Sequence, residues 1–522
     1  MFQDIPFDLA AADRMEDWRD GFAWPLPHDA IYRMGMAVSR DFVGLLDVLD
    51  DPMLKDVFTL IGPLQMATLL TLLESALWIQ HSEETGLRFS GGPKEIYMLR
   101  GVTAPINPEF TEPSTAYAPP LRHETLRRLV RTASWTPWYR MPGALLAPTA
   151  TAISHNNLLR SHASDGAERL TFRHADTILA QGRRRMGHPA RPDYDGLFER
   201  IGEIVERRAG LGPHLVARVM ELFTAAARPV FDVGHELVCA ARSVPRLPMR
   251  LWAGTGGYRP ARALRIEARR RGGSVTGFDH SGSSGFIREI EGLAITEFTV
   301  SDRFFATTPR MAEIIEESGA HCLLGGHTEI VGACGDPSFA GQLTQPWTGP
   351  HNPPRVLYVS GAYIGFRQRF PSRIPDILKL DWQLRFAAQL KNIPIDLLAQ
   401  MHPGGLMRGK VHPVGQVAQL SNQNFETVAD WADVFLFDVV QSTTFTLALC
   451  TDRPIVLIDH GMNKFSGAIL EMLQRRCTIL KVGHDDRNLP QIDAAALEDA
   501  LCGSLERADP TECRALFAGE YS

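Results

Sequence analysis

The residues best suited to hold a phosphate group begin at His402, in the last third of the chain. His402 follows the strand-like run 395–401 and is followed by Pro403 and Gly404. In parallel α/β sheets, ligands bind beyond the carboxyl ends of the strands. An imidazole there can donate a hydrogen bond to a phosphate oxygen, Pro403 ends the strand, and Gly404 lets the backbone approach a ligand closely. The alternative is a turn with an incidental histidine.

A second polar cluster follows the next strand-like run, 434–438. Ser442, Thr443 and Thr444 stand where a helix should begin. Hydroxyl side chains cap helices, and together with free backbone N–H groups they can also bind an anion at the positive end of the helix. Capping alone is the simpler alternative. The two clusters lie on successive strand ends of one expected sheet, which favours a shared phosphate site.

A third group of residues could act on a proton. Asp279 and His280 end the strand-like run 274–278, where a carboxylate or an imidazole can serve as a general base toward a hydroxyl group. The pattern does not separate the two side chains, and a polar turn is the alternative. Upstream, Gly256 lies in a glycine-rich turn after the strand-like run 249–253, and we expect it to approach a ligand. Because Asp279 ends the following strand, a dinucleotide-dependent dehydrogenase remains a weaker alternative.

Glu289 and Glu291 follow this third group. Their spacing is more typical of a solvated helix face or loop than of a catalytic pair. We therefore do not place them in the predicted site.

The elements that position these groups read as two α/β domains behind a helical region. Residues 1–245 carry apolar residues mainly at helical spacing, whereas strands and helices alternate from Met249 onward. Residues 336–355 are rich in proline and glycine, so we place a linker at 341–355. The predicted domains are a helical region at 1–245, a Rossmann-like domain at 246–340 and a second one at 356–522. The predicted fold class is α/β, with two doubly wound Rossmann-like domains facing a cleft.

The order of motifs in 356–460 resembles a known family. A His-Pro pair, then an Asp-rich strand end with Ser-Thr and an Ala-Leu helix, then Arg-Pro before an apolar strand, is similar to the C-terminal domain of bacterial GT-B glycosyltransferases of surface-polysaccharide biosynthesis. In relatives that use CMP-activated sugars, such as sialyltransferases and Kdo transferases, the His and the Ser/Thr pair contact the nucleotide phosphate. The resemblance gives these roles to His402, Ser442 and Thr443. Polymer transferases of the CDP-glycerol type are similar in the same region.

Bulk properties restrict the class of protein. The chain has 522 residues, 54 Lys+Arg against 60 Asp+Glu, and a net charge of −6, which does not favour nucleic acid as a partner. Its seven cysteines form no Cys-x-x-Cys pair, and their spacing suits neither disulfides nor zinc, so we expect no metal site and no bound cofactor. The N-terminus lacks a secretory pattern, and Asp193 and Asp195, formally a D-x-D motif, read as a helix start.

Membrane contact is open at two places. The apolar window 58–79 contains Gln65 and Glu74, and it reads as a core helix rather than a membrane span. Arginines beside tryptophans near residue 130 favour either a solvated helix or an anionic surface. We expect a cytoplasmic protein, with peripheral contact to the inner membrane surface left open.

The sequence therefore predicts a metal-independent glycosyltransferase. It would move a sugar from a nucleotide donor, with CMP-nonulosonic acid or CMP-Kdo favoured through the resemblance, to a glycan or protein acceptor. Two alternatives are a UDP-sugar 2-epimerase of the same architecture and a non-catalytic sugar- or nucleotide-binding protein. The epimerase would need several carboxylates facing the cleft.

Overall fold

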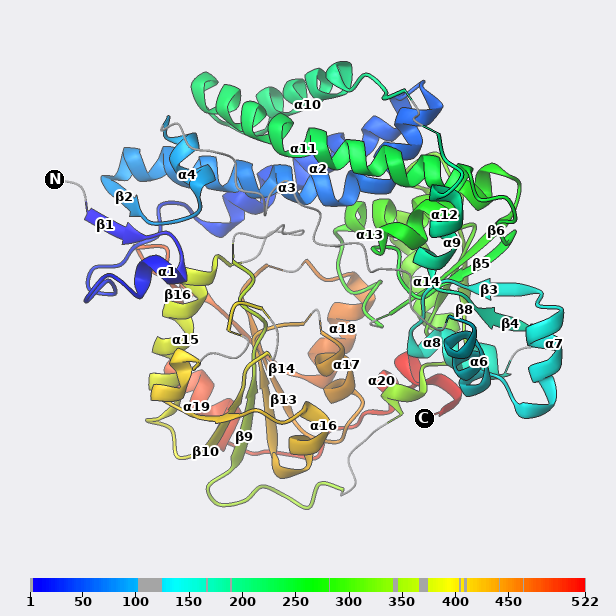
Figure 1. The fold of residues 1–522 in the computed structure, drawn as a ribbon. Coiled ribbons are helices and arrows are strands. Elements are labelled where there is room, and N and C mark those ends of the chain that lie inside the picture. Colours follow the sequence, from blue (N-terminus) through cyan, green and yellow to red (C-terminus); the bar gives the residue numbers. More distant parts are fainter. Residues whose placement is uncertain are drawn as a thin grey trace.

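Two parallel six-stranded sheets and a layer of long helices make up the protein (Figure 1). The computed structural model describes residues 3–101, 124–165, 168–187, 190–280, 282–340, 346–365, 374–402, 405–407, 411–440, 442–462 and 464–521. Both large sheets are parallel throughout, as expected for the predicted α/β class.

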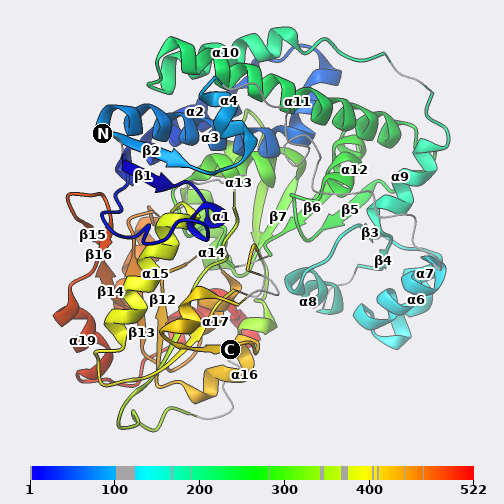
Figure 2. The same ribbon diagram turned by 60° about the vertical axis from the view of Figure 1, so that its left-hand side comes forward.

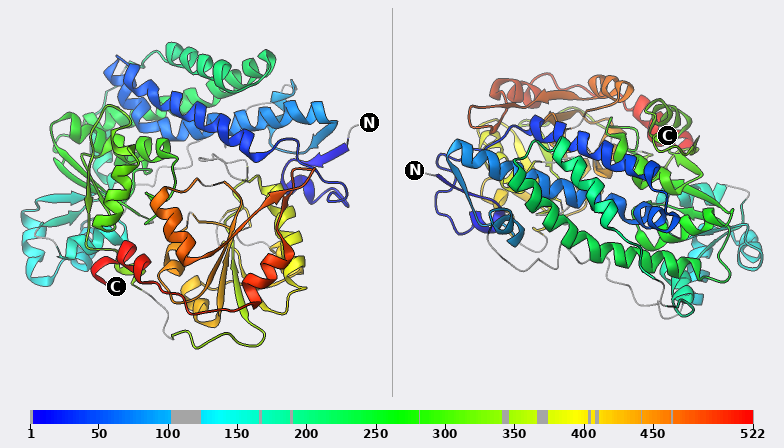
Figure 3. Two further views of the ribbon diagram at one scale, coloured as in Figure 1. Left: turned by 180° about the vertical axis from the view of Figure 1, so that it is seen from behind. Right: turned by 90° about the horizontal axis from the view of Figure 1, so that it is seen from above.

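The helical layer lies across one side of the molecule, above both sheets in Figure 1 and running side by side when seen from above in Figure 3. Its members are α2 (His28–Val48), α3 (Pro52–Thr85), α10 (Asp195–Arg208) and α11 (Pro213–Arg242). Helix α3 begins where Asp51 accepts the N–H of Met53 at 2.7 Å, directly before a proline that suits a first helical position. It ends at Gly86, whose φ of 75° is the left-handed conformation of a helix stop.

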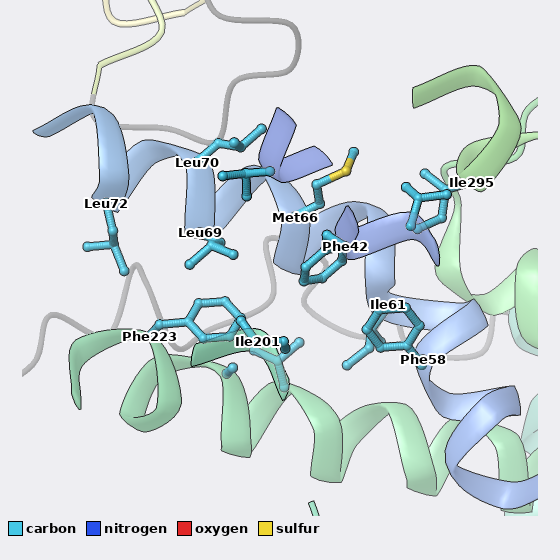
Figure 4. Close-up of a cluster of buried hydrophobic side chains, with 14 of the residues drawn as sticks. Phe42, Phe58, Ile61, Met66, Leu69, Leu70, Leu72, Ile201, Phe223 and Ile295 are labelled. Carbon is cyan, nitrogen blue, oxygen red and sulfur yellow. The ribbon is translucent and has the colours of Figure 1, made fainter. Parts of the chain in front are cut away.

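Helix α3 is the centre of the largest core. Figure 4 shows apolar side chains of α3 packed with side chains of α2, α10 and α11. Ile295, from the helix Ile290–Thr296 beside the first sheet, belongs to the same cluster. Among the described helices it is the one long and apolar enough to cross a membrane, and 78% of its most apolar window is buried inside the protein. This burial agrees with the core helix predicted for 58–79.

The first sheet has the strand order β4-β3-β5-β6-β7-β8. Its strands are β3 (Ala150–Ala152), β4 (Leu170–Phe172), β5 (Arg250–Ala253), β6 (Ser274–Phe278), β7 (Arg303–Ala306) and β8 (Glu329–Gly332). Because β3 pairs with β5, the sheet begins about a hundred residues earlier than the sequence suggested. The boundary predicted at residue 245 therefore passes through this sheet, and 1–245 is not wholly helical.

Helices connect these strands and cover the sheet. They are α6 (Glu124–Trp135), α7 (Met141–Leu146), α8 (Asn157–Asp165), α9 (Ala175–Arg183), α12 (Arg259–Arg270), α13 (Ile290–Thr296) and α14 (Pro309–Glu317), with the short helices η1 (Trp138–Arg140), η2 (Phe298–Val300), η3 (Ala320–Cys322) and η4 (Pro337–Phe339). In Figure 2, α6 and α7 lie at the outer end of this sheet, away from the second one.

The second sheet has the order β11-β10-β9-β12-β13-β14 and lies within the predicted domain 356–522, apart from its first residue. Its strands are β9 (Arg355–Val359), β10 (Asp396–Gln400), β11 (Gln419–Ser421), β12 (Val434–Phe437), β13 (Ile455–Asp459) and β14 (Thr478–Lys481). The helices around it are α15 (Asp376–Leu390), α16 (Phe425–Val428), α17 (Thr443–Leu449), α18 (Gly467–Arg476) and α19 (Ala494–Cys502), with η5 (Pro413–Gln416) and η6 (Ala429–Trp431).

The remaining elements lie near the two ends of the chain. They are β1 (Gln3–Pro6), α1 (Leu9–Ala12), β2 (Leu87–Ser90), α4 (Lys94–Leu99), β15 (Gly483–His484), β16 (Pro490–Gln491), α20 (Thr511–Phe517) and η7 (Gly519–Tyr521). Helix α20 returns to the first sheet, where Thr307 and Thr308 donate to the carbonyl of Leu516 at 3.0 and 2.9 Å.

The chain therefore passes between the two sheets twice, and both passages meet at one residue. The carboxylate of Asp452 accepts the N–H of Trp347 from the linker at 3.0 Å and the guanidinium of Arg507 from the returning segment at 3.1 Å. The N–H of Ala508 donates to its carbonyl at 3.0 Å. A separate contact joins the segment after β6 to the segment after β13. The N–H of Arg288 donates to the carbonyl of Lys464 at 2.7 Å, and the N–H of Ser466 donates to the carbonyl of Phe286 at 3.0 Å.

Candidate functional site

A cleft of about 1540 Å³ lies between the two sheets. Its first wall consists of ten residues between His280 and Glu297, which follow β6 and include part of α13, together with Pro63 and Met66 of α3. Its second wall consists of residues that follow β9, β10, β11 and β12. The carboxyl ends of strands from both sheets therefore face one space, the place where open parallel sheets bind ligands.

Five of the predicted site residues line this cleft. His280 belongs to the first wall. His402 and the run Ser442, Thr443 and Thr444 belong to the second. Pro403 and Gly404 lie outside the described residues. The structure thus brings the two polar clusters of the second sheet to one cavity, opposite His280.

Ser442 has a defined local role. It is the N-cap of α17, and its hydroxyl accepts the N–H of Phe445 at 3.1 Å. The capping expected from sequence is therefore present, and it places Thr443 and Thr444 at the rim of the cleft.

Asp279 and Gly256 are not among the cleft-lining residues. Asp279 is buried at the end of β6, and its N–H donates to the carbonyl of Phe305 at 2.9 Å. A Cβ on Gly256 would lie 2.2 Å from the carbonyl oxygen of Thr296, so glycine is required by a close backbone approach. This approach to α13, rather than contact with a ligand, is the physical reason for glycine at 256.

Glu289 is a cleft residue that the sequence analysis set aside. Its side chain is 3% exposed and lines the first wall. One carboxylate oxygen accepts a hydrogen bond from the hydroxyl of Tyr32 on α2, and the other has no hydrogen-bond partner among the described residues. The contact raises the pKa of Tyr32 above its usual value, after the larger effect of burial. The solvated position expected for Glu289 is wrong, because α2 covers it.

Glu297 is a second buried carboxylate on the same wall. It accepts the N–H of Gly256 at 2.8 Å, and its other oxygen lies 4.0 Å from the buried guanidinium of Arg265. Arg265 also donates to backbone carbonyls, including that of Val300 at 3.2 Å. Arg265 therefore connects α12 to a carboxylate on the cleft wall.

Glu291, between these two, is also buried but does not line the cleft. It accepts a hydrogen bond from Arg40 of α2 at 3.2 Å. The neighbouring carboxylates therefore differ in position, with Glu289 at the cavity and Glu291 behind it.

His412 is the residue of the second wall that the sequence analysis missed. It is 5% exposed, and burial, followed by the nearby Lys379, lowers its pKa to about 4. Its Nδ1 accepts the N–H of Val414 at 3.2 Å, so the proton of the neutral ring must lie on Nε2. Nε2 has no partner among the described residues, which leaves an N–H donor on a cleft-lining side chain. The signal was present in the sequence, because His412-Pro413 repeats the pair His402-Pro403 ten residues later.

The rest of the second wall combines neutral polar groups with apolar side chains and the carboxylate of Glu426. Its amide and hydroxyl groups include those of Ser360, Gln400, Ser421, Asn422 and Asn424. Gln400 is held by donation of its amide to the carbonyl of Gln423 at 2.7 Å, and Ser360 by donation to Asp438 at 2.9 Å. Among the described lining residues there is no lysine or arginine, and Lys379 lies behind the wall, donating to the carbonyl of Gly361.

Among the described residues, one group of side chains has ligand atoms close enough to share a metal ion. The group consists of His321, Cys322 and His327, none of which lines the cleft. Comparison with known proteins adds no identification: no family model matches the chain, and no curated protein is significantly similar to it.

Proposed function

We propose that the protein is a glycosyltransferase of the GT-B type, which uses a nucleotide-activated sugar. The single observation that carries this proposal is the composition of the cleft: acid–base groups of one sheet face hydrogen-bond donors of the other. His280 and Glu289 lie on the first wall, and His402, His412 and Ser442 lie on the second. A transfer reaction needs both sets, one for the acceptor hydroxyl and one for the leaving phosphate.

In this proposal the second wall binds the nucleotide phosphate. The Nε2–H of His412, together with His402 and the hydroxyls of Thr443 and Thr444, supplies hydrogen bonds to phosphate oxygens. These donors stabilise the negative charge that develops when the bond between the sugar carbon and the phosphate oxygen breaks.

The first wall binds the acceptor and accepts its proton. We assign the base to Glu289, because one carboxylate oxygen is held by Tyr32 while the other faces no partner among the described residues. The acceptor oxygen forms a bond to the anomeric carbon, its proton passes to Glu289, and the nucleotide leaves with the electron pair of the broken bond. A single displacement of this kind inverts the anomeric configuration. Asp279 remains buried beneath this wall as a positioning group for the strand end.

The donor we favour carries one phosphate, as CMP-sugars do. A nucleoside diphosphate brings a second phosphate group, and lysine and arginine are the side chains that usually balance such charge. The described part of the second wall offers neutral donors, histidines and one glutamate, Glu426, instead. CMP-nonulosonic acid and CMP-Kdo fit this proposal better than UDP- or GDP-sugars.

The direct test is a thermal-shift panel of CMP, CDP, UDP and GDP, with and without Mg²⁺. A ligand that binds only the folded state stabilises it by RT ln(1 + [L]/Kd). We expect CMP to give the largest shift and Mg²⁺ to leave it unchanged. No shift with any nucleotide would overturn the proposal, and a shift that requires Mg²⁺ would overturn its metal-independent form. Nucleotide binding without release of nucleotide from any CMP-sugar would point to a binding protein.

One observation favours a second candidate, the UDP-sugar 2-epimerase. That reaction needs several carboxylates at the cleft, and Glu289, Glu297 and Glu426 all line it. The two candidates differ in their products. An epimerase converts a UDP-sugar into its carbon-2 epimer with no acceptor present, which NMR of the sugar nucleotide detects directly, whereas a transferase releases nucleotide when an acceptor is added.

A further inference from the structure

The loop between α14 and β8 brings together three metal-ligating side chains outside the cleft. The nitrogen or sulfur ligand atoms of His321, Cys322 and His327 all lie within 4.8 Å of one another. His321 and Cys322 belong to η3, and His327 comes just before β8. The rings of the two histidines are 5.5 Å apart and perpendicular.

The backbone explains why these residues meet. Gly319 and Gly325 both have positive φ angles, 74° and 60°, which let the chain turn back within a few residues. The N–H of Thr328 donates to the carbonyl of His321 at 3.3 Å and closes the loop. The buried hydroxyl of Thr328 donates to carbonyls of Phe298 and Ser301 at 3.1 and 3.0 Å, so the loop is anchored to the segment after α13.

The side chains are in a state suited to a metal. Nδ1 of His321 is buried and has no hydrogen-bond partner among the described residues. Cys322 and His327 are exposed, which gives an ion access from solvent.

We propose that His321, Cys322 and His327 form a binding site for a zinc-class divalent ion. Two imidazole nitrogens and one thiolate are ligands that Zn²⁺ prefers over Mg²⁺ or Ca²⁺, and three protein ligands leave a fourth position for water. The site is separate from the proposed sugar-transfer chemistry and does not depend on it. Its bound ion would fix η3 and, through Thr328, the segment that follows α13 of the first wall.

The test uses the full chain, treated with a chelator and then titrated with Zn²⁺ or Co²⁺. We expect about one metal per chain by elemental analysis after gel filtration, and with Co²⁺ a thiolate-to-metal absorption band. Cys322→Ser should abolish that band, and Cys322→Ser or His327→Ala should weaken binding at least about tenfold. Cys334→Ser is the matched control, since Cys334 is exposed and lies outside the cluster.

Two results would overturn the proposal. One is the absence of any binding at micromolar Zn²⁺. The other is binding that both loop variants leave unchanged. A thermal shift with Zn²⁺ that survives in Cys334→Ser but not in Cys322→Ser would exclude a loss of fold as the cause.

A different observation concerns the outer end of the first sheet. Six of the exposed large apolar side chains, including Trp138 at 83% and Leu146 at 86%, lie between 126 and 146, in α6, η1 and α7. The others in this group are Leu126, Leu129, Val130 and Tyr139. Exposed apolar side chains concentrated in one short segment are typical of an interaction surface.

The charge of this segment identifies its partner. Residues 124–146, from the start of α6 to the end of α7, contain four arginines and one acidic residue, Glu124, although the chain as a whole has a net charge of −6. The guanidinium of Arg140 lies 5.6 Å from the ring of Tyr139 and that of Arg131 lies 4.7 Å from Phe172. Exposed Trp, Tyr and Leu beside arginines are the composition of a helix that lies in the interface of an anionic bilayer.

We infer that α6, η1 and α7 bind the surface of a membrane that contains anionic lipids. The test is sedimentation of the full chain with phosphatidylcholine vesicles, with and without phosphatidylglycerol. We expect binding only to the anionic vesicles, reduced at least about fivefold in the double variant Trp138→Ser/Leu146→Ser. Met249→Ser is the control, an exposed apolar residue directly before β5 and outside this segment.

Failure of the wild-type chain to sediment with anionic vesicles, or equal sedimentation of the double variant, would overturn this inference. Binding of soluble polyanions with no binding to vesicles would assign the surface to an acidic polymer instead.

Discussion

The two walls of the cleft differ in charge and in support. The first wall carries the buried carboxylates Glu289 and Glu297, and α2 and α12 hold them through Tyr32 and Arg265. The second wall offers amides, hydroxyls and histidines, and its carboxylate, Glu426, is exposed. A wall that keeps carboxylates buried suits proton transfer from an acceptor, and a wall rich in neutral donors suits a leaving phosphate. The difference implies a division of labour that variants of each wall can test.

The largest expected effect is that of Glu289→Gln. Glutamine keeps an oxygen for Tyr32 but cannot take a proton, so turnover should fall by about 10²–10⁴ while nucleotide binding is retained. The measurement is nucleotide release from the donor that the thermal-shift panel identifies. Glu291→Gln is the matched control, because Glu291 is equally buried but bound to Arg40 behind the wall. Unchanged turnover in Glu289→Gln would end the assignment of the base.

The next effect belongs to the second wall. His412→Ala removes the Nε2–H donor and should weaken nucleotide binding by about 10–100-fold, the usual range for a hydrogen bond to a charged group. Calorimetric titration measures it. His351→Ala is the control, since that histidine pairs with Asp433 at 2.9 Å outside the cleft. If the two variants bind nucleotide equally well, His412 does not contact the phosphate.

A fall in pH should lower the free energy of unfolding through two histidines, His28 of α2 and His460 after β13. The pKa of His28 and that of His460 are lowered to about 4, from 6.5 in the unfolded chain, mainly by burial and also by the nearby His484. For His28, the charge of Asp29 raises the pKa and that of Lys464 lowers it. For His460, the charge of Asp438 raises the pKa and that of Lys379 lowers it. The unfolded chain binds more protons between pH 4 and 6.5, so stability is complete above about pH 6.5 and falls as the pH drops toward 4.

The expected slope is about 1.4 kcal/mol for each histidine and pH unit in that window. Urea midpoints at about pH 7.5 and about pH 5 measure it. His460→Asn should flatten the slope, and His214→Asn, at an exposed position, should leave it unchanged. Equal slopes for wild type and His460→Asn would contradict this account.

The smallest effect separates two roles of Ser442. Ser442→Ala should cost about 1 kcal/mol of stability, because it removes the cap of α17. Ser442→Asp keeps a cap but adds a negative charge beside the proposed phosphate position. Stability near that of wild type, together with lost nucleotide binding, is expected for Ser442→Asp. Intact binding in this variant would leave Ser442 with the capping role alone.

Strands and site residues were predicted from the sequence where an apolar run in the sequence is also a buried strand in the structure. The four central strands of the second sheet, β9, β10, β12 and β13, were predicted, because they are apolar runs bounded by turns, whereas the edge strands β11 and β14 were not. The polar residues after β10 and β12 were expected on one cleft. Strands β3 and β4 were missed since each has three residues and stands within a helical region.

Other residues depend on contacts that sequence spacing does not reveal. Glu289 reads as solvated from its neighbours, and its burial comes from Tyr32, 257 residues earlier in the chain. Gly256 was assigned to a ligand because a glycine-rich turn after a strand is ambiguous, and the atoms it approaches belong to α13. His412 was overlooked although it repeats the His-Pro pair, because its neutral, buried state depends on the surrounding fold.

The meeting of the two chain passages at Asp452 has a mechanical consequence. The linker and the returning segment are both bound to Asp452, so a change in the angle between the two sheets strains one small group of hydrogen bonds. Other contacts oppose the same change. The backbone bonds between 286–288 and 464–466 lie next to Glu289, and the N–H of Trp24 donates to the carbonyl of Arg487 at 2.8 Å. The separation of the cleft walls therefore depends on bonds at several sides of the cavity, and Asp452 is the one place where a single side chain holds both passages of the chain among the described residues.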